Sequence, residues 1–153
     1  MAIDVILDAN VMGAYLFPEG NTADAVRVMD SILSGAVNAF VPSLFWAEVQ
    51  QICYQKTQPR GNRIPVALAV ADAAYARAGA FALHEFTEAL VDYRMTAWDL
   101  MRALGLGSYD AYYLALALDV GIPVWTFDQK FRDPVDAGPY QGAVLLIGQD
   151  VTV

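Results

Sequence analysis

A stretch near the end of the chain, from Ser108 to Asp128, constrains the fold more than any other. Its sequence, SYDAYYLALALDVGIPVWTFD, predicts a helix, a short Gly-Ile-Pro turn and a strand. Between Tyr109 and Leu118 every residue except Asp110 is apolar or aromatic, and a helix that is apolar on all sides is expected to be buried on all sides. Asp110 follows the expected N-cap Ser108, and its charge is costly there unless another group neutralises it.

The predicted strand ends in a second acid of the same kind. The apolar run from Val124 to Phe127 leads directly into Asp128. Two carboxylates at positions where a buried structure disfavours charge indicate one shared partner, and a metal ion is the simplest candidate. Further ligands are then expected elsewhere in the chain.

Size and composition limit the class of protein. The chain has 153 residues, of which 57% are hydrophobic, so we expect one domain over residues 1–153 with a substantial core. No apolar run reaches the roughly 18 residues of a membrane span, and the N-terminus lacks the features of a secretory signal. The single cysteine, Cys53, excludes an internal disulfide and fits a reducing compartment, so we expect a cytoplasmic protein without a membrane partner.

The charge balance bears on possible partners. The formal net charge is −8, which argues against loose, non-specific binding of nucleic acid because phosphate-binding surfaces are usually basic. Carboxylates that bind divalent cations would offset part of this charge locally. The charge is therefore weak evidence against a nuclease, and it mildly favours a basic protein partner.

Apolar runs alternate with helical patterns along the rest of the chain. The sequence predicts strands over residues 3–7, 39–41, 81–86, 124–127 and 143–147. It predicts helices over residues 21–33, 44–56, 65–78 and 87–104, and from Ser108 to the Gly-Ile-Pro turn. A turn is expected after Asp8 and a loop after Asp128. This alternation favours an α/β sandwich around a mostly parallel sheet.

Four acids can meet at one edge of such a sheet. Asp8 and Asp128 lie at the C-terminal ends of predicted strands, where the functional sites of parallel sheets are found. Glu48 and Asp110 lie in the opening turns of helices that face the same edge. Glu48 also has apolar neighbours at the helical spacings, which places it on the buried face of its helix.

The mutual repulsion of such acids indicates what would hold them together. Two like charges about 4 Å apart cost about 4 kcal/mol at an effective dielectric constant near 20, and a domain is stable by only about 5–15 kcal/mol. Four carboxylates would therefore require cations or bound protons. Oxygen ligands favour Mg²⁺ or Mn²⁺, and these ions suit phosphodiester hydrolysis because they activate water and stabilise phosphoryl charge.

Each acid also has a purely structural interpretation. Asp8 and Asp128 could stabilise turns through their side chains. Asp110 could lie at the positive end of its helix dipole, and Glu48 could pair with a lysine or arginine. One common site is a simpler explanation than four separate coincidences.

Four motifs carry a family resemblance. ILDANV, PSLFWAEV, SYDAYYLALA and IPVWTFDQKF resemble, in the same order, the acidic motifs of the PIN-domain nucleases, and most of all the small VapC-type toxins. The resemblance covers essentially the whole chain. It implies a three-layer α/β/α sandwich of about five strands and a homodimer. It also implies an endoribonuclease that cleaves RNA with Mg²⁺ or Mn²⁺ and is inhibited by a cognate antitoxin.

The resemblance also assigns roles to individual residues. The motif match makes Asp8, Glu48, Asp110 and Asp128 the catalytic, metal-binding acids. It makes Asn10 and Thr126 supporting residues, with Asn10 beside the first acid and Thr126 beside the fourth.

Other interpretations remain open. A PIN-fold module could bind RNA or a protein without cleaving it, and a metal-dependent phosphatase is a weaker possibility. A nucleophilic pair of Cys53 and His84 requires two lone residues to meet by chance. Five basic side chains in or beside predicted loops could bind phosphates or simply be solvated: Lys56, Arg60, Arg63, Lys130 and Arg132.

Overall fold

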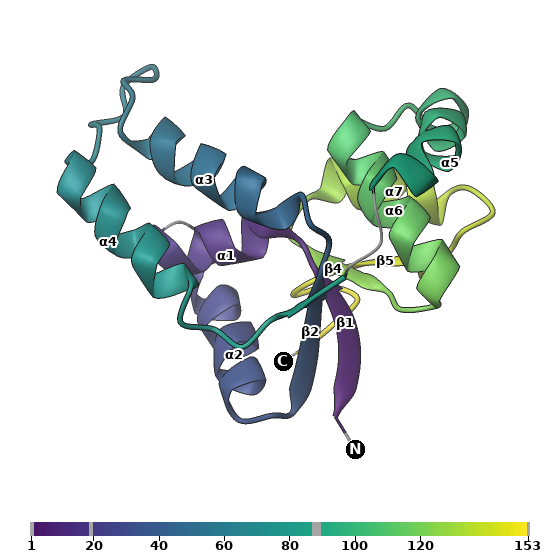
Figure 1. Ribbon diagram of the computed structural model, residues 1–153, viewed down its shortest axis with the longest axis horizontal. Helices are drawn as coiled ribbons and strands as arrows, with labels where there is room; N and C mark the ends of the chain where they lie inside the picture. The colour runs from purple at the N-terminus through teal and green to yellow at the C-terminus, as the bar shows by residue number, and fades with distance from the viewer. Residues whose placement is uncertain (1, 19, 87–89, 153) are drawn as a thin grey trace.

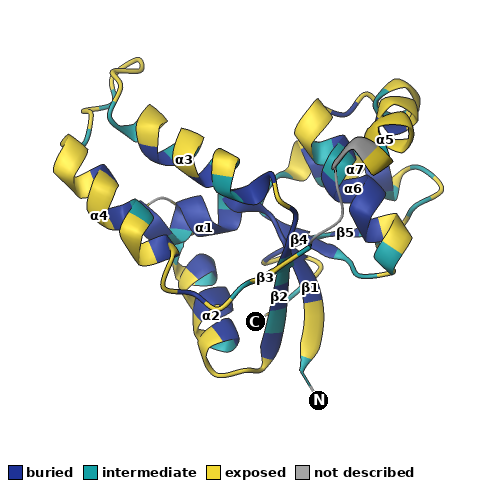
Figure 2. Cartoon of the chain, in the orientation of Figure 1, coloured by how far each residue is buried: buried dark blue, intermediate teal, exposed yellow. Residues whose placement is uncertain are grey.

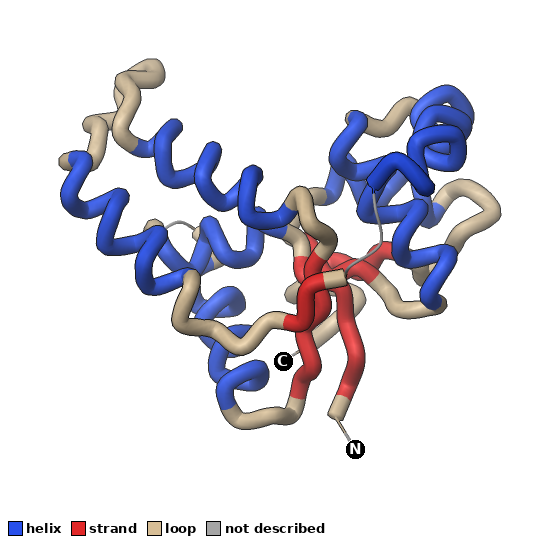
Figure 3. The backbone as a smooth tube through the Cα atoms, in the orientation of Figure 1, coloured by secondary structure: helices blue, strands red, loops and turns tan. Residues whose placement is uncertain are grey.

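A parallel five-stranded sheet forms the centre of the protein (Figures 1 and 3). The structure, a computed structural model, describes residues 2–18, 20–86 and 90–152. The strands are β1 (Ile3–Leu7), β2 (Val37–Val41), β3 (His84–Glu85), β4 (Val124–Thr126) and β5 (Val144–Leu146). Their order in the sheet is β3-β2-β1-β4-β5, and every neighbouring pair runs parallel.

Helices cover both faces of this sheet. Along β1, Val5 and Leu7 belong to one buried cluster and Ile6 to another, because successive side chains of a strand point to opposite faces. The first cluster packs against α1 (Ala9–Leu16), α2 (Thr22–Leu33), α3 (Phe45–Lys56) and α4 (Leu68–Ala78). The second packs against α5 (Leu90–Leu104), α6 (Ser108–Val120) and α7 (Gln129–Asp136). The predicted α/β/α sandwich with a parallel sheet is confirmed.

The apolar helix that dominates the sequence is α6. Its middle is buried from Tyr113 to Ala117, whereas Tyr109 is 59% exposed and Leu118 is 38% exposed. Burial on all sides is therefore correct only for the interior of this helix, as Figure 2 indicates by its colours. In the described part of the chain, no helix is both long and apolar enough to cross a membrane.

Two short helices stand where the sequence predicts a turn and a loop. Helix α1 contains Gly13, which lowers helix propensity, but a Cβ atom there would lie 3.1 Å from Cγ2 of Ile52. Glycine therefore allows α1 to lie close against α3. Helix α7 contains Pro134, which removes one helical hydrogen bond, and Phe131 and Val135 bury its inner face. Tertiary packing outweighs the local signals in both helices.

Several element boundaries also differ from the prediction. Strand β2 starts at Val37, and β3 is confined to two residues because the chain before it turns near Phe81. Helix α4 begins at Leu68, since the residues after Pro65 stay extended. The N-cap of α6 is Gly107, one residue before the expected Ser108. The predicted helix start at residue 87 lies outside the described residues.

Two glycines at helix ends provide a test of these caps. Gly121 ends α6 with φ of +70°, and a Cβ atom added there would have no other atom within 4 Å, so Gly121→Ala suffers backbone strain alone. We expect it to lower the free energy of unfolding by about 1 kcal/mol. Gly79 ends α4 with φ of −67°, so Gly79→Ala should leave stability unchanged or slightly raised. Urea denaturation measures both, and equal losses would contradict this account.

Candidate active site

The adjacent strands β1 and β4 bring two of the predicted acids together. Leu7 lies opposite Trp125 in the sheet, and the Asp8 amide donates to the Trp125 carbonyl at 3.1 Å. Asp8 directly follows β1 and caps α1 by accepting from the Asn10 amide. Asp128 lies just beyond β4 and caps α7 in the same way. Both carboxylates are thus fixed at the C-terminal edge of the sheet, and both also act as helix caps.

A hydrogen-bond network built on two side chains holds Asp8 in place. Asp8 is only 7% exposed and Thr126 is fully buried. The Thr126 hydroxyl donates to Oδ2 of Asp8 at 2.6 Å, and Nδ2 of Asn10 donates to the same oxygen at 2.8 Å. The Thr126 oxygen accepts from Nδ2 of Asn10 and from the Asp128 amide, both at 2.9 Å. Asn10 and Thr126 therefore connect the ends of β1 and β4.

The other two acids come from helices. Glu48 lies in the first turn of α3 and Asp110 in the first turn of α6, on opposite faces of the sheet. Both line a cavity of about 530 Å³ together with Asp8 and Asp128. Asn10 also lines this cavity. Thr126 is buried and does not line it, but its hydroxyl forms a hydrogen bond with Asp8. The structure thus brings all four predicted acids to one cavity.

Burial and mutual repulsion strongly affect the acids in this cavity. Burial raises the pKa of Asp8 to about 6, against the opposing effect of its hydrogen bond from Thr126. Burial, with the charges of Asp8 and Asp110, raises the pKa of Glu48 to about 7. Burial and the charges of Asp8 and Asp128 raise the pKa of Asp110 to about 6. The cavity therefore disfavours negative charge even though carboxylates line it.

Glu48 has an unusual buried environment. Its Oε2 atom is buried and has no hydrogen-bond partner among the described residues, and the same is true of the Tyr113 hydroxyl. Tyr113 lies near enough to lower the pKa of Glu48, yet no hydrogen bond of ordinary geometry joins them. No described lysine or arginine forms an ion pair with Glu48. A buried acceptor without a donor is where a cation is most favourable.

The donor set fits a hard divalent cation. All four acids offer oxygen ligands, which suit Mg²⁺ or Mn²⁺ better than zinc. Among the described residues, no three Asp, Glu, His or Cys side chains already stand in position to hold one ion. Some of these carboxylates would therefore have to change rotamer to bind an ion together.

Several residues that line the cavity are absent from the sequence prediction. Gln51 and Gln55 follow Glu48 at helical spacing and line the same cavity, and this spacing is a signal that could have identified them. Tyr113, which lies near Glu48 but does not line the cavity, is predicted from the sequence only as a core residue. Cys53 is buried between α3 and α4, and His84 lies on β3 against Phe40, with ring centroids 5.1 Å apart.

These features define an α/β protein with an acidic cavity at the C-terminal edge of a parallel sheet, and comparisons with known proteins name its family. The PIN domain family matches residues 5–136, so the chain belongs to that family, whose members are generally nucleases. The crystal structure of FitAcB from Neisseria gonorrhoeae has a similar fold, with a TM-score of 0.59 and 21% sequence identity. The similarity covers 92% of this chain and 95% of that chain. A search of curated proteins finds no significant match.

The raised pKa values predict how stability depends on pH without metal. These acids ionise near pH 4 in the unfolded chain but near pH 6–7 in the folded protein, so between these values the folded state holds more protons. The free energy of unfolding must then fall as pH rises. From pH 5 to pH 8 we expect a loss on the order of 2–4 kcal/mol, since one pKa unit corresponds to about 1.4 kcal/mol and partial exposure reduces the effect. Urea denaturation in a chelator measures this, and a rise in stability over the same range would refute it.

Two substitutions distinguish supporting residues from repelling acids. Thr126→Val keeps the shape of a buried side chain, but it leaves the Asp128 amide without its acceptor and removes the hydroxyl that donates to Oδ2 of Asp8, so it should cost about 1–3 kcal/mol. Asp110→Asn removes a partly buried charge repelled by Asp8 and Asp128, and at pH 8 it should stabilise the metal-free protein by on the order of 1–2 kcal/mol. Thermal and urea unfolding measure both changes. Destabilisation by Asp110→Asn would indicate that Asp110 has a structural role.

Proposed function

We propose that this protein is a metal-dependent endoribonuclease that cleaves RNA phosphodiester bonds in the cytoplasm. One observation carries the proposal: four acids, two that follow β1 and β4 and two in the first turns of α3 and α6, meet in one cavity of a PIN domain. Burial and repulsion make this arrangement unfavourable without a cation or bound protons.

Each side chain has a proposed role. Asp8, Glu48, Asp110 and Asp128 hold Mg²⁺ or Mn²⁺, which when bound acts as a Lewis acid on the scissile phosphate. Asn10 and Thr126 orient the Asp8 carboxylate through hydrogen bonds of 2.8 and 2.6 Å. Because Asp8 and Asp128 are both held by hydrogen bonds as helix caps, Glu48 and Asp110 are the acids that adjust when an ion binds.

We further propose that the protein is the toxin of a toxin–antitoxin pair and acts as a homodimer. The support is the resemblance of its four motifs to the VapC-type toxins. A net charge of −8 also favours a basic partner, which an antitoxin segment could provide. Co-expression with the neighbouring gene product and size measurement of the purified complex would test the partner and the dimer together.

A second candidate is a PIN-fold module that binds RNA or a protein without cleaving it. One observation favours it: no three candidate ligands among the described residues already surround a single ion position. A protein that binds RNA but never shortens it in the presence of either metal would establish this alternative.

Metal binding can be measured without knowledge of the RNA. A ligand that binds only the folded state raises stability by about 2.7 kcal/mol at a hundredfold excess over its dissociation constant. We expect Mn²⁺ or Mg²⁺ to raise the melting temperature of the wild type and to have much less effect on Asp110→Asn. Asp99→Asn, which removes an exposed acid from α5, is the matched control and should respond like the wild type.

Cleavage is the decisive assay. With Mg²⁺ or Mn²⁺ the wild type should cut a pool of single-stranded RNA, and a chelator should stop the reaction. Asp110→Asn and Glu48→Gln should each lower the rate by on the order of a thousandfold, as expected when metal-assisted stabilisation is lost. If both variants cut RNA at the wild-type rate, the four acids are not the active site.

A further inference from the structure

A second cavity adjoins the acidic one. It has a volume of about 260 Å³ and lies between α1, the C-terminal half of α3 and the loop over residues 57–67. It shares Asn10, Ile52 and Gln55 with the acidic cavity, so the two are neighbours along α3. The loop lies at the far end of the α3 and α4 arm in Figure 1, opposite the arm formed by α5–α7.

Basic side chains gather at this second cavity. Lys56, Arg60 and Arg63 line it, and none of the described residues that line it is acidic, in a chain with only nine lysines and arginines. In the described part of the chain, neither Arg60 nor Arg63 forms an ion pair. Burial, followed by the charge of Arg63, lowers the pKa of Lys56, so these two cations are near enough to repel each other. Such a cluster favours an anion.

Arg63 is held in place and still has a free donor. Its guanidinium donates to the carbonyl of Gln55, and also to that of Gln58 at 3.3 Å. Its Nε atom is buried and has no partner among the described residues. The tight turn from Arg60 to Arg63, closed by a backbone bond of 3.1 Å between them, keeps the two arginines on one loop. A guanidinium that is held by neutral carbonyls, lines the cavity and forms no ion pair among the described residues suits a phosphate.

A polar face of α3 connects the two cavities. Glu48, Gln51 and Gln55 all line the acidic cavity, and Gln55 also lines the basic one. Their spacing of three and four residues places them in one row along the helix. This row leads from the candidate metal ligand Glu48 to the basic cavity, where Arg60 and Arg63 offer donors suited to a polyanion.

We infer that the basic cavity binds a backbone phosphate of the single-stranded RNA next to the scissile one, with Arg63 and Arg60 as its donors. The strand then runs along α3 over Gln51 and Gln55. This inference rests on the proposed nuclease function and adds a substrate subsite to it. RNA is favoured over an acidic protein segment because the cavity continues directly into the site where a phosphodiester would react.

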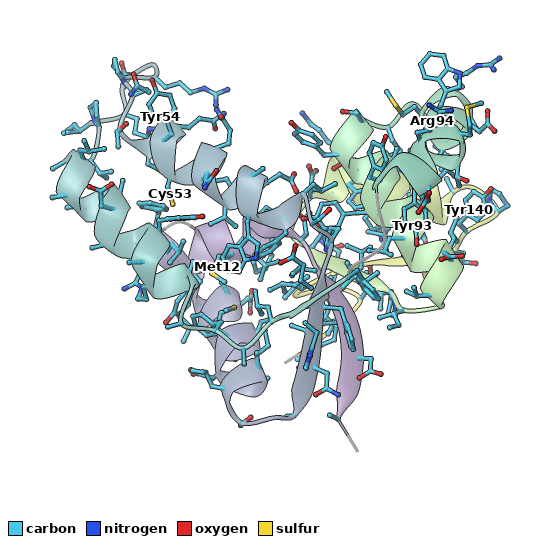
Figure 4. The ribbon with its side chains drawn as sticks, viewed as in Figure 1. Met12, Cys53, Tyr54, Tyr93, Arg94 and Tyr140 are labelled. Carbon is cyan, nitrogen blue, oxygen red and sulfur yellow. The ribbon has the colours of Figure 1, made fainter. Side chains whose placement is uncertain are left out.

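The test compares matched charge removals. Arg60→Gln and Arg63→Gln, alone and together, are made in the Asp110→Asn background so that RNA is not cleaved. Arg94→Gln is the control, because it removes the same charge from an exposed position on the opposite arm (Figure 4). Binding of a fluorescent single-stranded RNA of mixed sequence is measured over a series of KCl concentrations, and thermal unfolding verifies that each variant is folded.

The double variant should bind RNA roughly tenfold or more weakly, the usual effect of removing a charge-assisted hydrogen bond. Its plot of log affinity against log salt should flatten by about 0.7 for each phosphate that is no longer neutralised. Arg94→Gln should change neither quantity. If Arg63→Gln unfolds, Arg60→Gln alone decides, since the Arg60 side chain forms no ion pair within the described residues and its removal should leave the fold intact.

Two results would overturn the inference. In the first, the basic variants bind RNA as tightly as Arg94→Gln does. In the second, they keep RNA affinity but lose affinity for polyglutamate, which would assign the cavity to a protein partner.

The proposed nuclease function is tested separately, by measuring RNA cleavage by variants in which Asp110 is restored. If that function holds, Arg60→Gln and Arg63→Gln raise KM and leave kcat nearly unchanged, because the subsite binds a phosphate that does not react.

Discussion

The buried carboxylate of Asp8 is the constraint on which the rest of the site depends. An ionised group this far from solvent requires hydrogen-bond donors, and Thr126, Asn10 and the Asn10 amide supply them at 2.6, 2.8 and 3.2 Å. Thr126 belongs to β4, the neighbour of β1 in the sheet, and Asn10 belongs to α1, the helix that follows β1. The same contacts that make Asp8 tolerable therefore set the register at the end of β4 and the start of α1. These contacts also position Asp128, because its amide donates a hydrogen bond to the Thr126 oxygen.

Glu48 and Asp110 stand in a different relation to the fold. They reach the cavity from helices on opposite faces of the sheet, and their raised pKa values come first from burial and then from the neighbouring charges. The fold holds these two acids against an electrostatic cost, and Glu48 keeps a buried oxygen without a partner among the described residues. An arrangement that weakens the folded protein is more readily explained by binding and chemistry than by architecture.

The sequence is sufficient to predict the sheet, most of its helices and the meeting of the four acids. Alternating apolar strands and helices specify a parallel sheet, and the sheet collects the residues that follow its strands. Helices α1 and α7 escape prediction, because Gly13 and Pro134 are local signals against a helix and only packing overrides them. The basic cavity also depends on tertiary structure. The positions of Arg60 and Arg63 follow from how a polar loop folds back on α3, which no periodic pattern encodes.

The two capping acids have an evolutionary consequence. Asp8 and Asp128 each satisfy the exposed amides at the start of a helix, so their loss would harm the folded chain whether or not it reacts with anything. The pKa of Asp8 is raised as well, but Glu48 and Asp110 bear a similar electrostatic cost without capping a helix. In a gene copy released from selection for activity, drift would therefore erase the two helix acids first and keep the two caps. A relative that retains only the first and last acidic motifs is then expected to be folded but inert, and the pattern of surviving acids would record the loss of activity.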